Sequence, residues 1–213
     1  MSDLVPSLEY RALSPIFVER QPRPLQRVTV DARIAMTAYR RLTRLADYGD
    51  SAEASYSLTR VPEDIIWHEV VNPPVLYAHG LPLGLRVVGS LADFGINTSD
   101  TDAHFFFDIN PIRPIDHEGM LRLLDLAYPP PVTVVETMRI RCTAEEGHKA
   151  SPLIYDATRC VRPEHFMDRM RVSQLGVSDV VMVDCLVIKG NHRSGWEVLF
   201  ELLSLLVLER VPV

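Results

Sequence analysis

The last part of the chain carries two long apolar runs joined by a short polar segment, and this pattern constrains the fold more than any other. The runs are DVVMVDCLVI and WEVLFELLSLLVLERV, and the segment between them holds the turn-forming pairs Gly190-Asn191 and Ser194-Gly195. Apolar runs rich in β-branched residues on both sides of such a turn predict a β-hairpin.

The second of these runs allows other interpretations. Glu197 and Glu201 lie four residues apart, as they would on one face of a helix. Only Ser204 is polar between Leu202 and Leu208, but a membrane span needs about 20 apolar residues. We therefore expect a core strand or a core helix. The alternative is a surface for self-association or for entry into a membrane interface.

A second clear strand signal lies in the segment VTVVETMRIRC, residues 132–142. Side chains alternate between the two faces of a strand, so Met138, Ile140 and Cys142 share one face. Arg139 and Arg141 share the other face. The alternation predicts that the apolar face belongs to the scaffold and that the two arginines are contact residues.

The rest of the chain mixes strand and helix signals. Period-two patterns predict strands at residues 27–42, 55–61, 82–94 and 103–109. Helical patterns predict helices at residues 61–72, 119–128 and 162–171, and the first and last of these have proline and carboxylates in the first turn. Residues 1–26 carry prolines and no steady period, so we expect an extended N-terminal arm followed by one globular domain, residues 27–213.

Charge is unevenly distributed in this acidic chain. The net charge of −6 over 213 residues excludes general binding of polyanions by the molecule as a whole. Residues 19–44 nevertheless carry seven arginines against two carboxylates. This stretch is either an ordinary solvated face or a patch for anionic lipid or for a partner's acidic surface. The contact residues that it suggests are Arg20, Arg23, Arg27, Arg40, Arg41 and Arg44.

Catalytic and cofactor signals are weak. Asp100, Asp102 and His104 would share one face of a strand, where Asp102 and His104 could serve a small hydratase or hydrolase. No metal-ligand spacing, phosphate-binding loop or nucleophile motif accompanies them. We therefore expect no enzyme, no metal and no cofactor. Three scattered cysteines favour an intracellular, reducing environment.

Two short motifs lie in the expected arm. The apolar stretch Ser14 to Val18 interrupts polar sequence, and such a stretch often docks into a groove on the same or a neighbouring molecule. Tyr10-Arg11-Ala12-Leu13 reads Tyr-x-x-Leu, a pattern that a partner can capture as an extended peptide.

The order of these pieces resembles the matrix proteins of rhabdoviruses. The likeness is best over residues 81–94, 132–159 and 194–199, which contain PLGLRVVGSLADF, VTVVETMRIR with ASPLIYDATR, and SGWEVL. The resemblance implies an α+β fold, a twisted and mainly antiparallel sheet with packed helices, preceded by a flexible N-terminal arm. An adaptor or capsid protein of another virus family is a further alternative.

The resemblance also implies a function. It implies a non-enzymatic protein of the virion that self-associates into a helical lattice, condenses the nucleocapsid, underlies the envelope and drives budding. Its partners would be itself, the viral nucleoprotein, the anionic inner leaflet and a glycoprotein tail, without direct sequence-specific binding of nucleic acid. It would be found in the host cytoplasm, at the cytoplasmic face of membranes and in the nucleus. The segment for self-association would be Pro15, Ile16 and Phe17, and Tyr10 with Leu13 the late-motif-like pair.

Overall fold

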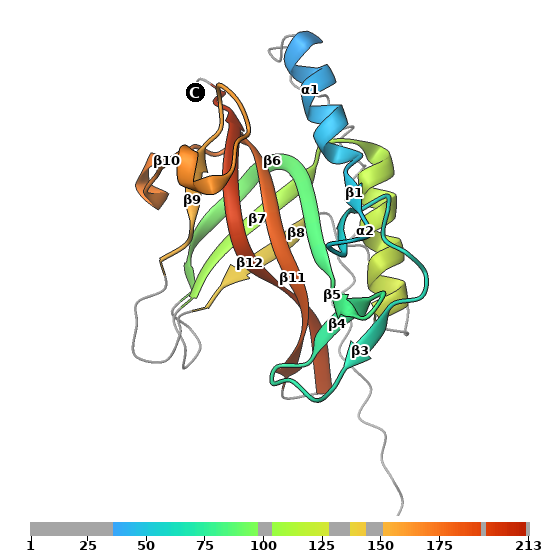
Figure 1. Ribbon diagram of the computed structural model, residues 1–213. Helices are drawn as coiled ribbons and strands as arrows, with labels where there is room; N and C mark the ends of the chain where they lie inside the picture. Colours follow the sequence, from blue (N-terminus) through green and yellow to red (C-terminus); the bar gives the residue numbers. More distant parts are fainter. Residues whose placement is uncertain (1–35, 98–103, 128–136, 144–150, 193–194, 212–213) are drawn as a thin grey trace, which may run out of the picture.

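The computed structural model of the chain describes residues 36–97, 104–127, 137–143, 151–192 and 195–211 (Figure 1). The helices are α1 (Met36–Ala46) and α2 (Pro114–Ala127), with 3-10 turns at Glu164–Phe166 and Val172–Gln174. The strands are β1 (Gly49–Asp50), β2 (Ser55–Ser57), β3 (Ile66–His68), β4 (Val75–Ala78), β5 (Leu81–Pro82), β6 (Gly84–Asn97), β7 (His104–Pro111), β8 (Met138–Cys142), β9 (Ile154–Asp156), β10 (Asp168–Arg169), β11 (Val180–His192) and β12 (Gly195–Glu209).

Five of the strands close into a barrel. The hydrogen-bonded order is β6, β7, β8, β12, β11, and β11 pairs with β6 again. The pairs are antiparallel except β8 with β12, which is parallel. The chain thus makes the meander β6-β7-β8, crosses to β11 beside β6, and returns through β12. This is a Greek-key path, and Figure 1 shows the curved strands wrapping around one interior.

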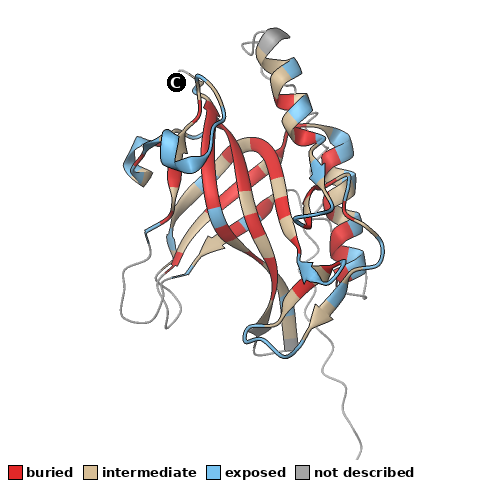
Figure 2. Ribbon diagram, in the orientation of Figure 1, coloured by how far each residue is buried: buried red, intermediate tan, exposed pale blue. Residues whose placement is uncertain are grey.

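The barrel interior follows from the alternation of side chains along each strand. Val181, Val183 and Val187 of β11 point inward and are fully buried, as are Phe107 and Ile109 of β7. Burying side chains of this size stabilises the fold by about 1.5–3 kcal/mol each before the entropic costs. The red interior in Figure 2 marks this core.

Helix α2 closes one end of the barrel. Its residues Met120, Leu123 and Ala127 are buried in the same core as the strands. Gly119 of α2 lies against the chain after β2, where an added Cβ would stand 2.6 Å from the carbonyl oxygen of Leu58. The close approach explains the absence of a side chain at this position.

Helix α1 covers a second, smaller apolar cluster outside the barrel. Leu42 and Ala46 of α1 pack with Val88 of β6, Met182 of β11 and Leu206 of β12. These strand residues point away from the barrel interior, so α1 lies across the outer face of β6, β11 and β12.

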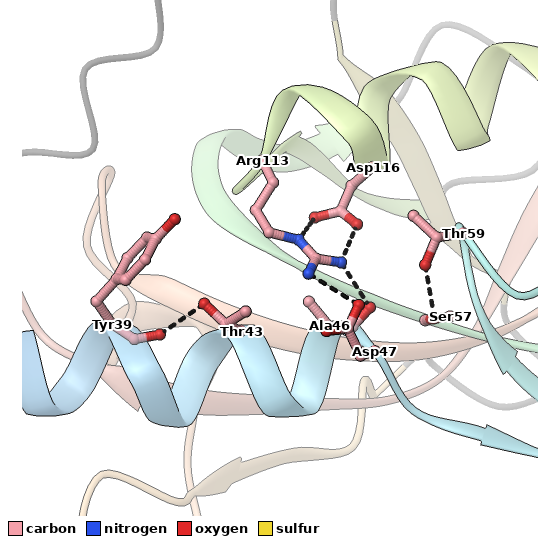
Figure 3. Close-up of polar contacts among 8 residues, drawn as sticks. All are labelled: Tyr39, Thr43, Ala46, Asp47, Ser57, Thr59, Arg113 and Asp116. Atoms are coloured by element: carbon pink, nitrogen blue, oxygen red, sulfur yellow. Dashed lines mark hydrogen bonds and ion pairs between the residues drawn. The ribbon is translucent and has the colours of Figure 1, made fainter.

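Arg113 joins the two helices (Figure 3). It donates hydrogen bonds of 2.8 and 2.6 Å to the buried carboxylate of Asp116 in the first turn of α2. It also donates to Asp47, at 2.8 Å, and to the carbonyl oxygen of Ala46 at the end of α1, at 3.0 Å. These bonds raise the pKa of the Arg113 guanidinium above its ordinary value, so the charge persists. The contact therefore fixes the end of α1 against the start of α2.

The β11–β12 hairpin extends beyond the barrel and carries a small extra sheet. β4 pairs with β11 through Val75 and Ile188, and β3 pairs with β4. The edge of Trp67 in β3 meets Trp196 in β12, with ring centroids 5.7 Å apart. Figure 1 shows β3, β4 and β5 grouped around the far end of the hairpin.

This architecture corrects the expected fold class. An α+β fold, with a mainly antiparallel sheet and packed helices, is wrong: the chain is mostly β, with a mixed sheet and two α-helices in the described residues. The sheet also curls into a barrel. The expected arm, residues 1–26, lies outside the described residues.

Several expected elements are confirmed and three are wrong. The C-terminal hairpin and the strands at 82–94 and 103–109 are present, as is a helix over 119–127. Residues 36–46 form a helix rather than a strand, because Leu42 and Ala46 follow helical spacing. Residues 66–68 form a strand, because they pair with β4. Residues 162–171 contain a 3-10 turn and the strand β10, which pairs with β9, instead of an α-helix.

Candidate functional site

The outer face of β7 and β8 presents an aromatic ring beside two arginines. Phe106 and Asp108 point outward from β7, because they alternate along the strand with the buried Phe107 and Ile109. Arg139 and Arg141 point outward from β8 in the same way. The register sets Phe106 opposite Arg141 and Asp108 opposite Arg139. The predicted outward face of residues 138–142 is thus confirmed.

Arg139 is held in one orientation on this face. Its Nε and Nη2 donate hydrogen bonds of 2.8 and 2.6 Å to the two carboxylate oxygens of Asp108. Its guanidinium lies over the ring of Phe106, 4.7 Å from the centroid. The hydrogen bonds to Asp108 raise the pKa of Arg139, so it stays charged. The side chain of Arg139 is 60% exposed, whereas that of Asp108 is 11% exposed.

This arrangement forms a flat, charged platform. A planar guanidinium can stack on a ring on one side and on a nucleobase on the other. Because Asp108 occupies Nε and Nη2, the Nη1 group of Arg139 is left to donate outward to a ligand. The anchored guanidinium also loses little freedom when a ligand binds.

Arg141 lies beside the platform, where β8 meets β12. Its register partner across the parallel pair is Glu201, which accepts hydrogen bonds of 2.8 and 2.7 Å from the backbone amide and hydroxyl of Thr143. The Nε of Arg141 is buried and has no hydrogen-bond partner among the described residues. Arg141 therefore lies on the same face as Arg139, with its Nε shielded from solvent.

A shallow groove of about 400 Å³ lies where β7 starts and the β9–β10 pair approaches. Its lining residues are Phe105, Ser151, Pro152, Arg169, Met170, Arg171 and Val172. Arg169 and Arg171 are exposed, and Arg169 donates to the hydroxyl of Ser151 at 3.4 Å. The groove therefore combines part of an aromatic ring with two cationic side chains.

A second arginine–aspartate pair with similar geometry lies on another face of the barrel. Arg86 of β6 donates hydrogen bonds of 2.7 and 2.9 Å to Asp184 of β11 and lies over the ring of Tyr48, 4.3 Å from its centroid. The side chain of Arg86 is only 21% exposed. Arg86 and Arg139 thus share their local geometry and differ in how much of the guanidinium a ligand can reach.

Of the residues chosen from sequence, Arg139 and Arg141 belong to this site, whereas the described arginines of the 19–44 stretch lie elsewhere. Arg40 and Arg44 are exposed on α1, across the outer face of β6 and β11. Arg41 donates to the carbonyl oxygens of Ala157 and Thr158, at 2.6 and 3.1 Å, so its role is at least partly structural. The remaining predicted contact residues lie outside the described residues: Tyr10, Leu13, Pro15, Ile16, Phe17, Arg20, Arg23 and Arg27.

The predicted catalytic pair is not assembled in the described part of the chain. His104 is 6% exposed at the start of β7, and Asp100 and Asp102 lie outside the described residues. No group of three His, Cys, Asp or Glu side chains that could hold a metal ion occurs among the described residues. Within the same residues, no helix is both long and apolar enough to cross a membrane.

The barrel belongs to a known architectural class. A five-stranded Greek-key barrel of this kind is an OB-type fold, in which the face of the second and third strands binds oligonucleotides or oligosaccharides. In this chain the second and third barrel strands are β7 and β8. The platform of Phe106 and Arg139 lies on that face.

Comparisons with known proteins were made at three levels. No protein-family model matches the chain, and no curated protein matches it. One solved structure that matches is gp2.5, a single-stranded DNA binding protein encoded by bacteriophage T7, with 13% identity and a TM-score of 0.44 over 62% of this chain and 89% of that one. Another is the single-stranded DNA-binding protein of bacteriophage Enc34 in complex with single-stranded DNA, with 8% identity and a TM-score of 0.33 over 71% of this chain and 98% of that one.

These findings overturn the resemblance to rhabdovirus matrix proteins. The matched structures are nucleic-acid binding proteins of phages, and the closed barrel replaces the expected sheet with packed helices. The predicted lattice, budding activity, membrane attachment and nucleoprotein partner are therefore wrong. The alternative of a small enzyme using Asp102 and His104 is also wrong, as is the predicted set of partners, which included no direct sequence-specific binding of nucleic acid.

Proposed function

We propose that the chain binds single-stranded nucleic acid on the outer face of β7 and β8, and that it does so without catalysis. The observation that carries the proposal is the exposed stack of Arg139 on Phe106, placed on the second and third strands of a five-stranded barrel. The proposal rests on this geometry, because matches with these TM-scores and identities support no function for this chain.

The platform suits bases that are not paired in a duplex. Stacking on an aromatic ring or on a guanidinium requires an open base face, which duplex bases offer only after they unstack. Each stacked base contributes about 1–3 kcal/mol. The face also carries the carboxylate of Asp108, and the chain carries a net charge of −6, so the dense phosphates of a duplex are disfavoured.

Phosphates of the strand would be held by the arginines around the platform. Arg139 offers Nη1, and Arg141 lies beside it on the same face, partly exposed. Arg169 and Arg171 continue the cationic path in the adjacent groove. Local arginines can contact a phosphate backbone even in an acidic protein, because salt screens distant charges beyond about 8 Å at physiological ionic strength.

The test is binding of fluorescent oligonucleotides of about 20 nucleotides, which exceeds the 4–16 nucleotides that one such fold covers. Fluorescence anisotropy would be measured with single-stranded DNA, single-stranded RNA and a DNA duplex. The proposal predicts that a single strand binds more tightly than the duplex, and that affinity falls as salt rises. Comparing the affinities for single-stranded DNA and single-stranded RNA shows which nucleic acid the protein prefers.

The control is Tyr48, whose ring also lies under an arginine but is not on the proposed nucleic-acid binding face. Phe106→Ala should weaken binding about tenfold, the value of one lost stack, while Tyr48→Ala should change it less than about twofold. Both rings lie under a bidentate arginine. Equal binding by the wild-type protein and the Phe106→Ala variant, or no binding of either single strand at low salt, would refute the proposal.

A further inference from the structure

A mainly apolar sheet surface lies outside the barrel, with side chains that range from buried, as at Ile188, to well exposed, as at Ile66. The row Leu199, Ile188, Val75 and His68 runs from β12 across β11 and β4 to β3, by the observed register. Beside it, Ile66 is 64% exposed and Leu203 is 45% exposed. We call this surface the distal sheet face. Figure 2 shows that β3, β4 and the far end of the hairpin carry partly and fully exposed residues, in contrast with the buried barrel.

The distal sheet face leads into a groove with an acidic rim. The groove has a volume of about 300 Å³, and its apolar lining includes Leu186 and Leu203. Three carboxylates, Glu53, Glu164 and Asp184, line it together with Arg86, which is bonded to Asp184. Glu53 and Glu164 are exposed, so the rim is negative.

A segment of this chain complements that surface. Residues 14–27, SPIFVERQPRPLQR, hold an apolar stretch followed by three arginines against one glutamate. Phe17 precedes Met36, the first residue of α1, by 19 positions in the sequence. An extended chain of that length reaches about 60 Å, which exceeds the ~15 Å length of α1. The C-terminal end of α1 is followed by Tyr48, whose ring lies under Arg86, and Arg86 lines the groove.

Other occupants fit the rim less well. A second copy docked face to face by a two-fold axis would bring the same carboxylates against one another, which is unfavourable. An anionic membrane would be repelled by Glu53 and Glu164. We therefore propose that residues 14–18 of this chain cover its own distal sheet face and that Arg20, Arg23 and Arg27 meet the acidic rim. This proposal is separate from nucleic-acid binding, because it uses a different face of the barrel.

Disulfide trapping tests the proposal on the full chain. Cys142 and Cys160 are first changed to serine, whereas Cys185 is fully buried and is kept. Phe17→Cys is then combined with Leu203→Cys, or with Val177→Cys as the control, because Val177 is 52% exposed before the start of β11 and away from the groove. Mild oxidation should give a cross-link within one chain for the Leu203 pair and not for the Val177 pair. A cross-link between chains, equal trapping at both positions or no trapping would overturn the proposal.

Proteolysis gives an independent measurement without added cysteines. Trypsin can cut after Arg20, whereas Pro24 protects the bond after Arg23. Leu203→Asp should accelerate cleavage after Arg20 about tenfold, because it removes part of an apolar contact and adds a carboxylate to it. Val177→Asp should leave the rate unchanged. Near-ultraviolet circular dichroism checks that both variants fold, and equal cleavage rates in the two folded variants would overturn the proposal.

Discussion

Strands β6 and β7 approach each other so closely at Gly89 that adding one methyl group there tests the packing of the barrel. Gly89 lies in β6, paired with Pro111 of β7 on one side and with Val181 of β11 on the other. A Cβ built at Gly89 would collide with the carbonyl oxygen of Asn110 and stand 2.6 Å from Cγ2 of Ile109. Backbone atoms of a central strand cannot move aside as a flexible side chain can, so Gly89→Ala must push β6 and β7 apart.

The expected cost follows from these contacts. Overpacking a core costs about 1–3 kcal/mol, and each weakened ladder hydrogen bond adds about 1 kcal/mol. We therefore expect Gly89→Ala to lower the free energy of unfolding by about 2–4 kcal/mol. For a chain of this size that lowers the thermal midpoint by roughly 5–15 °C.

Gly84→Ala is the matched control in the same strand. The nearest atoms to a Cβ at Gly84 are 3.6 Å away, an ordinary contact, and neither glycine has a positive φ angle. We expect Gly84→Ala to change stability by less than about 0.5 kcal/mol. The assay is urea denaturation followed by far-ultraviolet circular dichroism, with the thermal midpoint as a second readout. If Gly89→Ala is as stable as Gly84→Ala, the β6–β7 packing described above is wrong.

Three further predictions concern the arginines and one thiol. Arg139→Ala should weaken binding of single-stranded DNA about tenfold in the anisotropy assay, while Arg86→Ala, which loses the same bidentate geometry, should not; equal effects would contradict the role of the exposed guanidinium. Arg113→Ala should lower the free energy of unfolding in urea by about 3–5 kcal/mol, because it leaves a buried carboxylate unpaired; a loss below about 1 kcal/mol would contradict this. Burial raises the pKa of the Cys142 thiol to about 11, so in a Cys160→Ser variant iodoacetamide should react slowly at neutral pH and faster as the thiolate forms toward pH 11, whereas a rate equal to that of free cysteine at pH 8 would contradict the burial.

Local sequence patterns predict the elements that bury one face and expose the other, because such elements show a regular alternation of apolar and polar residues. The C-terminal hairpin and β8 follow period two because one face is buried, and the same alternation predicts the outward position of Arg139 and Arg141. Helix α2 was partly predicted from its apolar spacing.

The errors arise where tertiary contacts decide the conformation. Residues 61–72 have apolar residues at helical spacing, but residues 66–68 form a strand because they pair with β4. The closure of β6 on β11 pairs residues that are 90 to 102 positions apart in the sequence, from Val180 with Ser90 to Leu186 with Gly84, and no local pattern predicts it. The weak blocks that resembled a matrix protein reflect the order of elements along the chain, which does not specify how the sheet closes.

The sequence predicts some residues of the candidate site but not the contacts between them. Period two predicts the strand at residues 103–109 and the outward position of Arg139 and Arg141, but the stack of Arg139 on Phe106 depends on the β7–β8 register. The arginine-rich stretch predicts contact residues on α1, but Arg41 bonds to carbonyl oxygens after β9. Net charge also misled, because it averages over faces of opposite character.

The most direct test of the account is to map where a single strand touches the protein. Photocross-linking of the full chain to single-stranded DNA containing 5-iodouracil, followed by mass spectrometry of the peptides, identifies the contacted residues. The account predicts cross-links to β7 and β8, at Phe106 first, and to the groove that contains Arg169. Cross-links confined to α1 or to the distal sheet face, with none on β7 or β8, would contradict it.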